Sequence, residues 1–199
     1  MTVILTDCDG VLLNWEYAFD IWMQRKGYVK NTDARFEYGI DKRYNIDKKR
    51  KEDLIATFNE SAMIGFLPPL RDAIEYVQKL HREHGYVFHV ITSLSLDPSA
   101  MELRTQNLKK LFGETVFEKF VYLDTGADKD DELAKYRGKE YWWVEDKIEN
   151  AEIGFQAGLR PILMEHAHNM THKKFPRAKN WKAIYDIVTS QNFCDSIPK

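Results

Sequence analysis

The sequence predicts an α/β fold in which helices cover both faces of a doubly wound parallel sheet, giving three layers. Two observations support this prediction. Short, almost wholly apolar runs are typical of strands buried on both faces, and amphipathic helical patterns alternate with them in the second part of the chain. The 199 residues are 44% hydrophobic and 30% charged, which excludes disorder, collagen and coiled coil. This length suits one core with at most a small extra lobe.

The first predicted strand is the apolar run from Val3 to Leu5, which leads into Thr6 and ends before Gly10. Such a short run gives no room for a helix, and glycine marks its end. Similar runs recur later in the chain, at Tyr86–Ile91, Phe120–Leu123, Tyr141–Val144 and Pro161–Met164.

Helical patterns lie between these runs. In Asp72–His84 the apolar side chains share one face at 3.6 residues per turn, and Ala100–Phe112 and Ile148–Ala157 behave likewise. Gly113 and Gly158 are placed where helices commonly end. The alternation implies right-handed crossovers between parallel strands.

One segment interrupts the alternation. From residue 14 to 68 no strand pattern occurs, and the segment is helical, charged and rich in aromatic residues until Pro68-Pro69. We therefore expect a core domain made of residues 1–13 and 69–199, and a small helical cap of residues 14–68 above the end of the first strand.

Reactive side chains follow the predicted strands. The first strand ends at Asp7 and Asp9, the second at Thr92-Ser93 and the fourth at Glu145-Asp146, and Lys129 follows the third after a short loop. Open parallel sheets bind ligands at the carboxyl ends of their strands. Carboxylates with a hydroxyl and an ammonium group suit Mg²⁺ and a phosphate group.

Each of these features also has a plain explanation. Thr92-Ser93 and Glu145-Asp146 could simply cap the turns that follow them, and a lysine in the charged run Asp128–Glu132 is ordinarily a solvated surface residue. Their common position at strand ends, in a fixed order, favours the functional interpretation.

The remaining candidates have weaker support. His166, His168 and His172 could bind zinc, although no cysteine lies near them, and Cys8 beside two carboxylates is expected to pack rather than react. The net charge of −2 argues against binding to long nucleic acid, and no apolar run is long enough to cross a membrane. With two distant cysteines, a reduced cytoplasmic protein is expected.

The strand-end motifs resemble those of the haloacid dehalogenase (HAD) superfamily of phosphohydrolases, which has a Rossmann-type core. The four motifs correspond to Val3–Leu12 (VILTDCDGVL), Phe88–Ser93 (FHVITS), Lys129 and Trp142–Asn150 (WWVEDKIEN). The segment 14–68 lies where that superfamily places its C1-type helical cap. A phospho-accepting regulatory module shares several of these residue types, but its acceptor lies on an internal strand and it has no cap.

A narrower resemblance is to the 5′(3′)-deoxyribonucleotidases. It rests on GVLLNWE at Gly10–Glu16, LPPLRDA at Leu67–Ala73, Thr92-Ser93, His168-Asn169 and NWKAIYDI at Asn180–Ile187. Two departures are visible: Glu145-Asp146 stands where that family has two aspartates, and Gly126-Ala127-Asp128 lacks the arginine that precedes its lysine.

The resemblance implies a Mg²⁺-dependent hydrolysis of phosphate monoesters in two steps. Asp7 would be the nucleophile, Asp9 the general acid and base, and Thr92 and Lys129 would hold the phosphoryl oxygens. Asp7, the carbonyl of Asp9 and Asp146 would bind the metal, and Glu145 would support them indirectly.

The substrate implied is a small phosphate ester, in particular a nucleoside monophosphate, handled by a monomer or homodimer. The residues expected to contact it are Trp15, Ser93, Phe36, Tyr38 and Phe66. Three alternatives remain: another small phosphate ester, a phosphorylated nucleic-acid end, and a catalytically idle binding protein.

Overall fold

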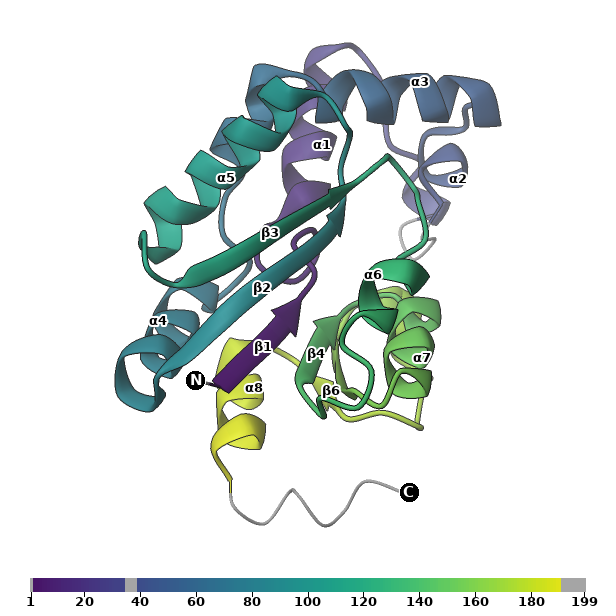
Figure 1. Ribbon diagram of the computed structural model, residues 1–199. Helices are drawn as coiled ribbons and strands as arrows, with labels where there is room; N and C mark the ends of the chain where they lie inside the picture. The colour runs from purple at the N-terminus through teal and green to yellow at the C-terminus, as the bar shows by residue number, and fades with distance from the viewer. Residues whose placement is uncertain (1, 35–38, 191–199) are drawn as a thin grey trace.

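The computed structural model describes residues 2–34 and 39–190 and contains a six-stranded parallel sheet of order β3-β2-β1-β4-β5-β6 (Figure 1). Every neighbouring pair of strands is parallel. The strands are β1 (Thr2–Thr6), β2 (Tyr86–Ser93), β3 (Phe117–Leu123), β4 (Trp142–Glu145), β5 (Arg160–Met164) and β6 (Arg177–Ala178). The predicted doubly wound α/β fold is confirmed.

Helices cover both faces of the sheet. One face packs against α4 (Ala73–His84), α5 (Pro98–Phe112) and α8 (Trp181–Thr189), and the other against α6 (Asp130–Ala134) and α7 (Ile148–Gln156). Successive strand residues therefore enter different cores: Ile4 belongs to the cluster with α4, α5 and α8, whereas Leu5 faces α6 and α7.

The predicted elements are present with shifted ends. β2 extends through Thr92-Ser93, β3 begins three residues earlier than the apolar run suggested, and α5 begins at Pro98 behind an Asp97 N-cap that accepts from the backbone N–H of Ala100. The two-residue strand β6 and the one-turn helix α6 have too few residues to show a period in the sequence.

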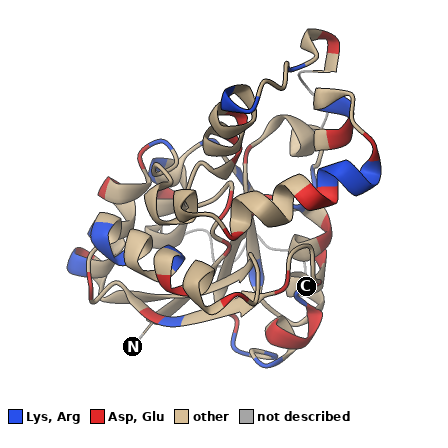
Figure 2. Ribbon diagram, turned by 90° about the horizontal axis from the view of Figure 1, so that it is seen from above, with Lys and Arg blue, Asp and Glu red and all other residues tan. Residues whose placement is uncertain are grey.

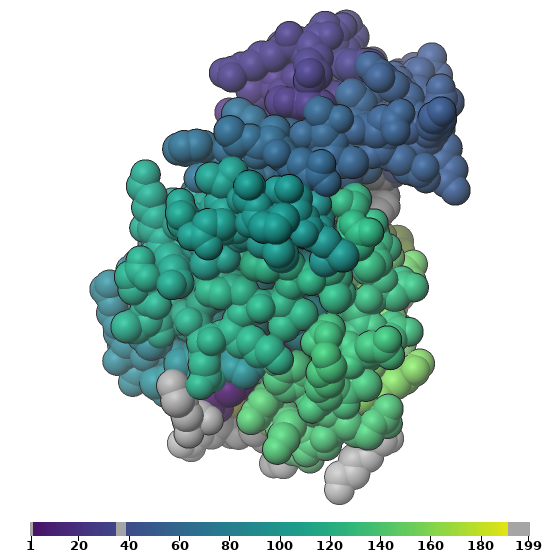
Figure 3. All heavy atoms as spheres, turned by 45° about the horizontal axis from the view of Figure 1, so that its top comes forward, coloured from purple at the N-terminus to yellow at the C-terminus, as the bar shows by residue number. Residues whose placement is uncertain are grey.

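The segment between β1 and α4 is helical in its described part. It contains α1 (Trp15–Arg25), α2 (Ile40–Tyr44), α3 (Lys48–Asn59) and two short 3₁₀ helices, η1 (Thr32–Ala34) and η2 (Ala62–Phe66). Its atoms gather above the rest of the molecule in Figure 3. Asn14 N–H donates to the carbonyl of Pro68 at 2.9 Å, and Leu70 N–H donates to the carbonyl of Leu12 at 2.8 Å. The chain therefore enters and leaves this helical segment at neighbouring points.

Charged residues of both signs are interspersed along the ribbon (Figure 2). Among the residues described, no helix has the length and apolar character needed to span a bilayer.

Candidate functional site

The chain turns sharply after β1, and this turn presents two aspartates. Asp7 N–H still donates to Val144 of β4 at 2.8 Å, and the Cys8 carbonyl then accepts from the N–H groups of Val11, Leu12 and Leu13. Gly10 allows the turn because its φ is +75° and a Cβ there would lie 2.7 Å from Oδ2 of Asp146. The backbone thereby brings the end of β1 against the end of β4.

Lys129 lies between two carboxylates at the centre of the site. Its Nζ is 2.8 Å from Asp7 Oδ1 and 2.8 Å from Glu145 Oε2, and the residue is only 2% exposed. The plain alternative of a solvated surface lysine is therefore excluded, because the loop after β3 folds the side chain inward over the Trp143 ring. Burial opposes its charge, but Asp7 and Glu145 outweigh burial and raise the pKa of Lys129.

Glu145 and Asp146 differ in their surroundings. Glu145 is fully buried: its Oε1 accepts from the N–H groups of Asp146 and Lys147, and its Oε2 from Asn150 and Lys129. These contacts position the backbone between β4 and α7. Both residues line the adjacent cavity, but the Asp146 side chain is 14% exposed and that of Glu145 is 0% exposed, so Asp146 is the one of the pair that can reach a ligand.

The carboxylates fit a hard divalent cation. One ligand atom from each of Asp7, Glu145 and Asp146 lies within 4.8 Å of the others. Burial raises the pKa of Asp7 to about 6, and burial with the charge of Asp7 raises the pKa of Asp146 to about 7. Lys129 alone thus leaves the negative charge incompletely balanced, and a cation with oxygen ligands such as Mg²⁺ would balance it.

The predicted hydroxyl pair ends β2 beside this cluster. Thr92 is 1% exposed and Ser93 donates through Oγ to the carbonyl of Ala127 at 2.7 Å. Both residues line the cavity with Lys129. Ser93 therefore also fixes the loop that carries Lys129, a role the sequence did not indicate.

Asp9 is held by a residue that the sequence analysis missed. Arg104 of α5 is fully buried, and its Nη1 lies 2.7 Å from Asp9 Oδ1 and 3.0 Å from Cys8 Sγ. A signal was present: Ala100, Arg104 and Leu108 are four residues apart, which places a charged residue on the apolar face of the helix. Cys8 is fully buried, and burial raises the pKa of its thiol to about 12, which disfavours the nucleophilic thiolate.

Two of the three histidines, His166 and His168, stack on each other with ring centroids 5.7 Å apart and contact backbone carbonyls of the site. His166 Nε2 lies 2.6 Å from the Gly10 carbonyl, and His168 Nε2 lies 2.9 Å from the Asp146 carbonyl, which also accepts from Asn169 at 2.8 Å. Within residues 2–34 and 39–190, His166, His168 and His172 do not make a metal-ligand group, so the zinc alternative gains no support.

A cavity of about 590 Å³ opens onto these groups. Its floor is formed by the carboxyl ends of β1, β2 and β4. One wall comes from the helical segment, through Trp15, Ile40, Arg43, Lys51 and Ile55, and the rest comes from the loops after β3 and β5 and the turn before α4. Arg43 is buried and paired with Glu16, and Lys51 lies 3.5 Å from Asp41. The cavity is thus polar at the floor and of mixed character near the helices.

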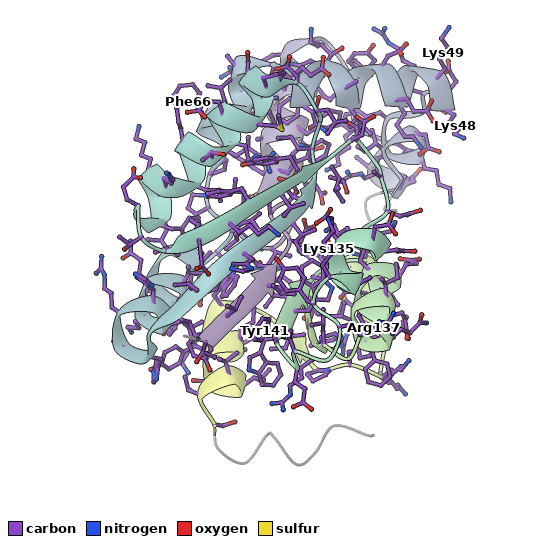
Figure 4. The ribbon with its side chains drawn as sticks, in the orientation of Figure 1. Lys48, Lys49, Phe66, Lys135, Arg137 and Tyr141 are labelled. Atoms are coloured by element: carbon purple, nitrogen blue, oxygen red, sulfur yellow. The ribbon has the colours of Figure 1, made fainter. Side chains whose placement is uncertain are left out.

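The predicted substrate residues divide into three groups. Trp15 lines the cavity, while one face of its indole stacks on Phe19 at 4.6 Å and its Nε1 donates to Asn59 at 2.9 Å. Phe66 does not line the cavity: it is 70% exposed and lies at the edge of the molecule near α5 (Figure 4). The prediction for Phe66 is corrected, because η2 packs on α5 with Phe66 turned outward. Phe36 and Tyr38 lie outside the described residues.

No protein-family model matches the chain. One curated relative, an uncharacterized 32.4 kDa protein from the Gp30-rIII intergenic region of Enterobacteria phage T4, is 30% identical over 114 residues. The match covers 55% of this chain and spans 40% of the length of that protein.

Solved structures resemble the chain over nearly its whole length. A haloacid dehalogenase-like hydrolase from Streptococcus pneumoniae gives a TM-score of 0.62 at 14% identity, covering 92% of this chain and 97% of its own. The chain has a HAD-like fold. YfnB from Bacillus subtilis, described as a putative HAD-hydrolase and solved with bound magnesium, gives a TM-score of 0.61 at 13% identity, covering 95% of this chain and 99% of its own. The D,D-heptose 1,7-bisphosphate phosphatase of Burkholderia thailandensis gives a TM-score of 0.58 at 11% identity, and the match covers 96% of this chain and 100% of that protein's chain.

Proposed function

We propose that the protein is a Mg²⁺-dependent phosphomonoester hydrolase, with segment 14–68 acting as a cap over the site. The observation that carries the proposal is the convergence of Asp7, Asp9, Lys129 and Asp146 on one cavity at the strand ends of a HAD-like fold. The same fold in a phosphatase for heptose bisphosphate and in a hydrolase with bound magnesium supports a small phosphate ester and this metal.

The nucleophile is Asp7, at the end of β1. Its carboxylate attacks phosphorus and forms an aspartyl-phosphate while the bond from phosphorus to the leaving oxygen breaks. Dividing the reaction in this way replaces one very slow hydrolysis with two easier displacements. Lys129 keeps Asp7 oriented through the 2.8 Å contact and, with Thr92, faces the phosphoryl oxygens that gather charge.

The proton is handled by Asp9. It gives a proton to the leaving alkoxide in the first step, and takes one from the attacking water in the second, when phosphate leaves and Asp7 is restored. Asp7, Asp146 and the carbonyl of Asp9 would hold Mg²⁺, which would supply positive charge to neutralise the phosphoryl oxygens.

A turnover screen tests this proposal. Purified protein with Mg²⁺ is assayed against nucleoside monophosphates, sugar phosphates, phosphorylated DNA ends and p-nitrophenyl phosphate. We expect phosphate release from small esters and its loss in Asp7→Asn, together with loss of the covalent phosphate trapped by acid quench. Near-normal turnover by Asp7→Asn would refute the nucleophile assignment.

The finer part of the proposal is that the substrate is a nucleoside monophosphate, in particular a deoxyribonucleotide. A cavity of about 590 Å³ can hold such a molecule, and Trp15 offers an aromatic surface for a base in its wall. The interspersed surface charges favour a small molecule over a long nucleic acid (Figure 2).

Trp15→Ala tests the base contact. We expect KM for the preferred nucleotide to rise about tenfold, which is about 1.4 kcal/mol and within the range of roughly 1–3 kcal/mol for base stacking. KM for p-nitrophenyl phosphate should stay within about threefold. Trp22→Ala is the matched control, because Trp22 packs on the same Phe19 and Phe58 rings but does not line the cavity. Equal effects of both variants on both substrates would make Trp15 purely structural.

A further inference from the structure

Arg104 lies directly behind the proton-handling aspartate. It comes from the middle of α5, is 0% exposed, and does not line the cavity, whereas Asp9 does. Nη1 is shared between Asp9 Oδ1 at 2.7 Å and Cys8 Sγ at 3.0 Å. Any effect of Arg104 on a bound ester must therefore pass through Asp9.

The guanidinium is costly where it lies. Within the part of the chain that the structure describes, neither Nε nor Nη2 of Arg104 has a hydrogen-bond partner, although both are buried. Removing such a charge from water is expensive, and replacing a buried ion pair with apolar side chains is often neutral or stabilising. Apolar side chains in place of both members of the Arg104–Asp9 pair would thus pack at least as well, so packing alone does not explain the arginine.

The contact restricts Asp9. The Asp9 side chain is 23% exposed, and its Oδ1 is the oxygen that Arg104 engages. Holding one oxygen of a carboxylate restricts the rotation of the group, and it leaves the second oxygen as the one that a ligand in the cavity can meet. A general acid acts only when it lies within hydrogen-bond reach of the atom it protonates.

We propose that Arg104 is a positioning residue that holds Asp9 with one carboxylate oxygen toward the leaving group. The inference rests on the proposed phosphatase function. As the bond from phosphorus to the leaving oxygen breaks and the bond from Asp7 forms, the proton passes from this oxygen of Asp9 to the leaving alkoxide. In the second step the same oxygen takes a proton from the water that displaces Asp7.

The leaving group provides the test. An aryl phosphate such as p-nitrophenyl phosphate releases a stable anion and needs little protonation, whereas an alkyl phosphate needs the acid. We expect Arg104→Met to lower kcat about 100-fold for the alkyl phosphate that the wild-type protein hydrolyses fastest, the scale of general acid catalysis. For p-nitrophenyl phosphate we expect a loss of less than about tenfold, and KM for both esters within about threefold.

A second variant distinguishes the positioning role from a general loss of folding. Arg104→Lys keeps the buried charge but cannot bridge Asp9 and Cys8 as the guanidinium does, and we expect a selective loss for the alkyl ester of about tenfold. Asn107→Ala is the matched control: Asn107 is also buried on α5 and donates to the Leu67 carbonyl at 3.0 Å, away from Asp9. Its ratio of alkyl to aryl turnover should equal that of the wild type.

A measurement without turnover complements these rates. In a double-mutant cycle of thermal unfolding, Arg104→Met should cost more stability in the wild type than in the Asp9→Asn background, because the ion pair is already lost there. Equal loss of kcat for both esters, or an unchanged ratio in both Arg104 variants, would overturn the positioning role. Failure of the wild-type protein to hydrolyse either ester would instead count against the proposed function.

Discussion

Asp146 shows how the surroundings of one side chain set its chemistry. Burial and the nearby charge of Asp7 raise its pKa to about 7, and the pKa of Asp7 is raised to about 6. In the unfolded chain both groups titrate near their ordinary values. Between about pH 4 and 7 the folded, metal-free protein therefore binds more protons than the unfolded chain, and its stability falls as the pH rises through this window.

Asp146→Asn should remove much of this dependence. In EDTA we expect the Tm of the wild type to fall between pH 5 and 8 by about 5–10 °C more than that of Asp146→Asn. Adding Mg²⁺ at pH 8 should raise the wild-type Tm and leave that of Asp146→Asn nearly unchanged.

Asp186→Asn is the control for this prediction. Asp186 is 57% exposed on α8, paired with Lys182, and outside the cavity. The Tm of Asp186→Asn should depend on pH, and respond to Mg²⁺, as the wild-type Tm does. Equal slopes for Asp146→Asn and the wild type would show that the carboxylate cluster is not the source of the pH dependence.

Residues of the site differ in how far the sequence could reveal them. Asp7, Asp9 and Asp146 follow buried strands and Thr92 lies at the end of β2, so the topology of a parallel sheet brings them to one edge. The burial of Lys129 depends on a loop whose path no local pattern records. Phe66 was misplaced for the same reason, because only packing of η2 on α5 decides which way it turns.

At the scale of elements, the sheet could be predicted because its strands are apolar on both faces, and its long helices because they carry a period of 3.6 residues. The short elements α6 and β6 could not, since tertiary contacts rather than propensity form them. Helix α7 shows how close such tertiary contacts can be. It packs against β4 through Gly154, where a Cβ would lie 2.4 Å from Cδ1 of Trp143.

Gly154→Ala should therefore destabilise the protein despite the better helix propensity of alanine. Trp143 is fully buried and its Nε1 donates to the Asn150 carbonyl at 3.1 Å, so it cannot move aside. Overpacking typically costs about 1–3 kcal/mol, which we expect urea denaturation to show as a lower midpoint with an unchanged slope. Gln156→Ala, exposed on the same helix, should change stability by less than about 0.5 kcal/mol.

Coupling between the two positions checks the cause. Trp143→Phe makes room, so the double variant should lose less stability than the sum of the single variants. Additive losses would place the effect of Gly154→Ala elsewhere than in the contact between α7 and β4.

At the scale of the whole molecule, the site lies where the strand order changes direction. β2 and β4 flank β1 on opposite sides, and connections from these strands leave over opposite faces of the sheet. Such a point leaves a crevice at the carboxyl ends of the strands. The helical segment above it shares one continuous apolar cluster with the sheet, which includes Phe19 and Phe58 as well as Ile4 and Phe88.

This shared cluster predicts that the molecule unfolds in one step. Asn59 joins the two parts further, because it accepts from Trp15 and donates to the Leu94 carbonyl after β2 at 2.9 Å. The segment would expose much of its apolar surface if it separated from the sheet, so it should not survive alone or melt alone. Far-UV circular dichroism and tryptophan fluorescence should give coincident urea transitions.

Phe58→Ala tests the prediction that the molecule unfolds in one step. Phe58 is fully buried in α3 and contacts Trp15, Phe19 and Trp22, so its truncation should cost about 3–5 kcal/mol. If the molecule is one cooperative unit, this loss shifts the transitions seen by tryptophan fluorescence and by far-UV circular dichroism equally. Two separated transitions would instead show that segment 14–68 unfolds independently and that the shared apolar cluster does not couple it to the sheet.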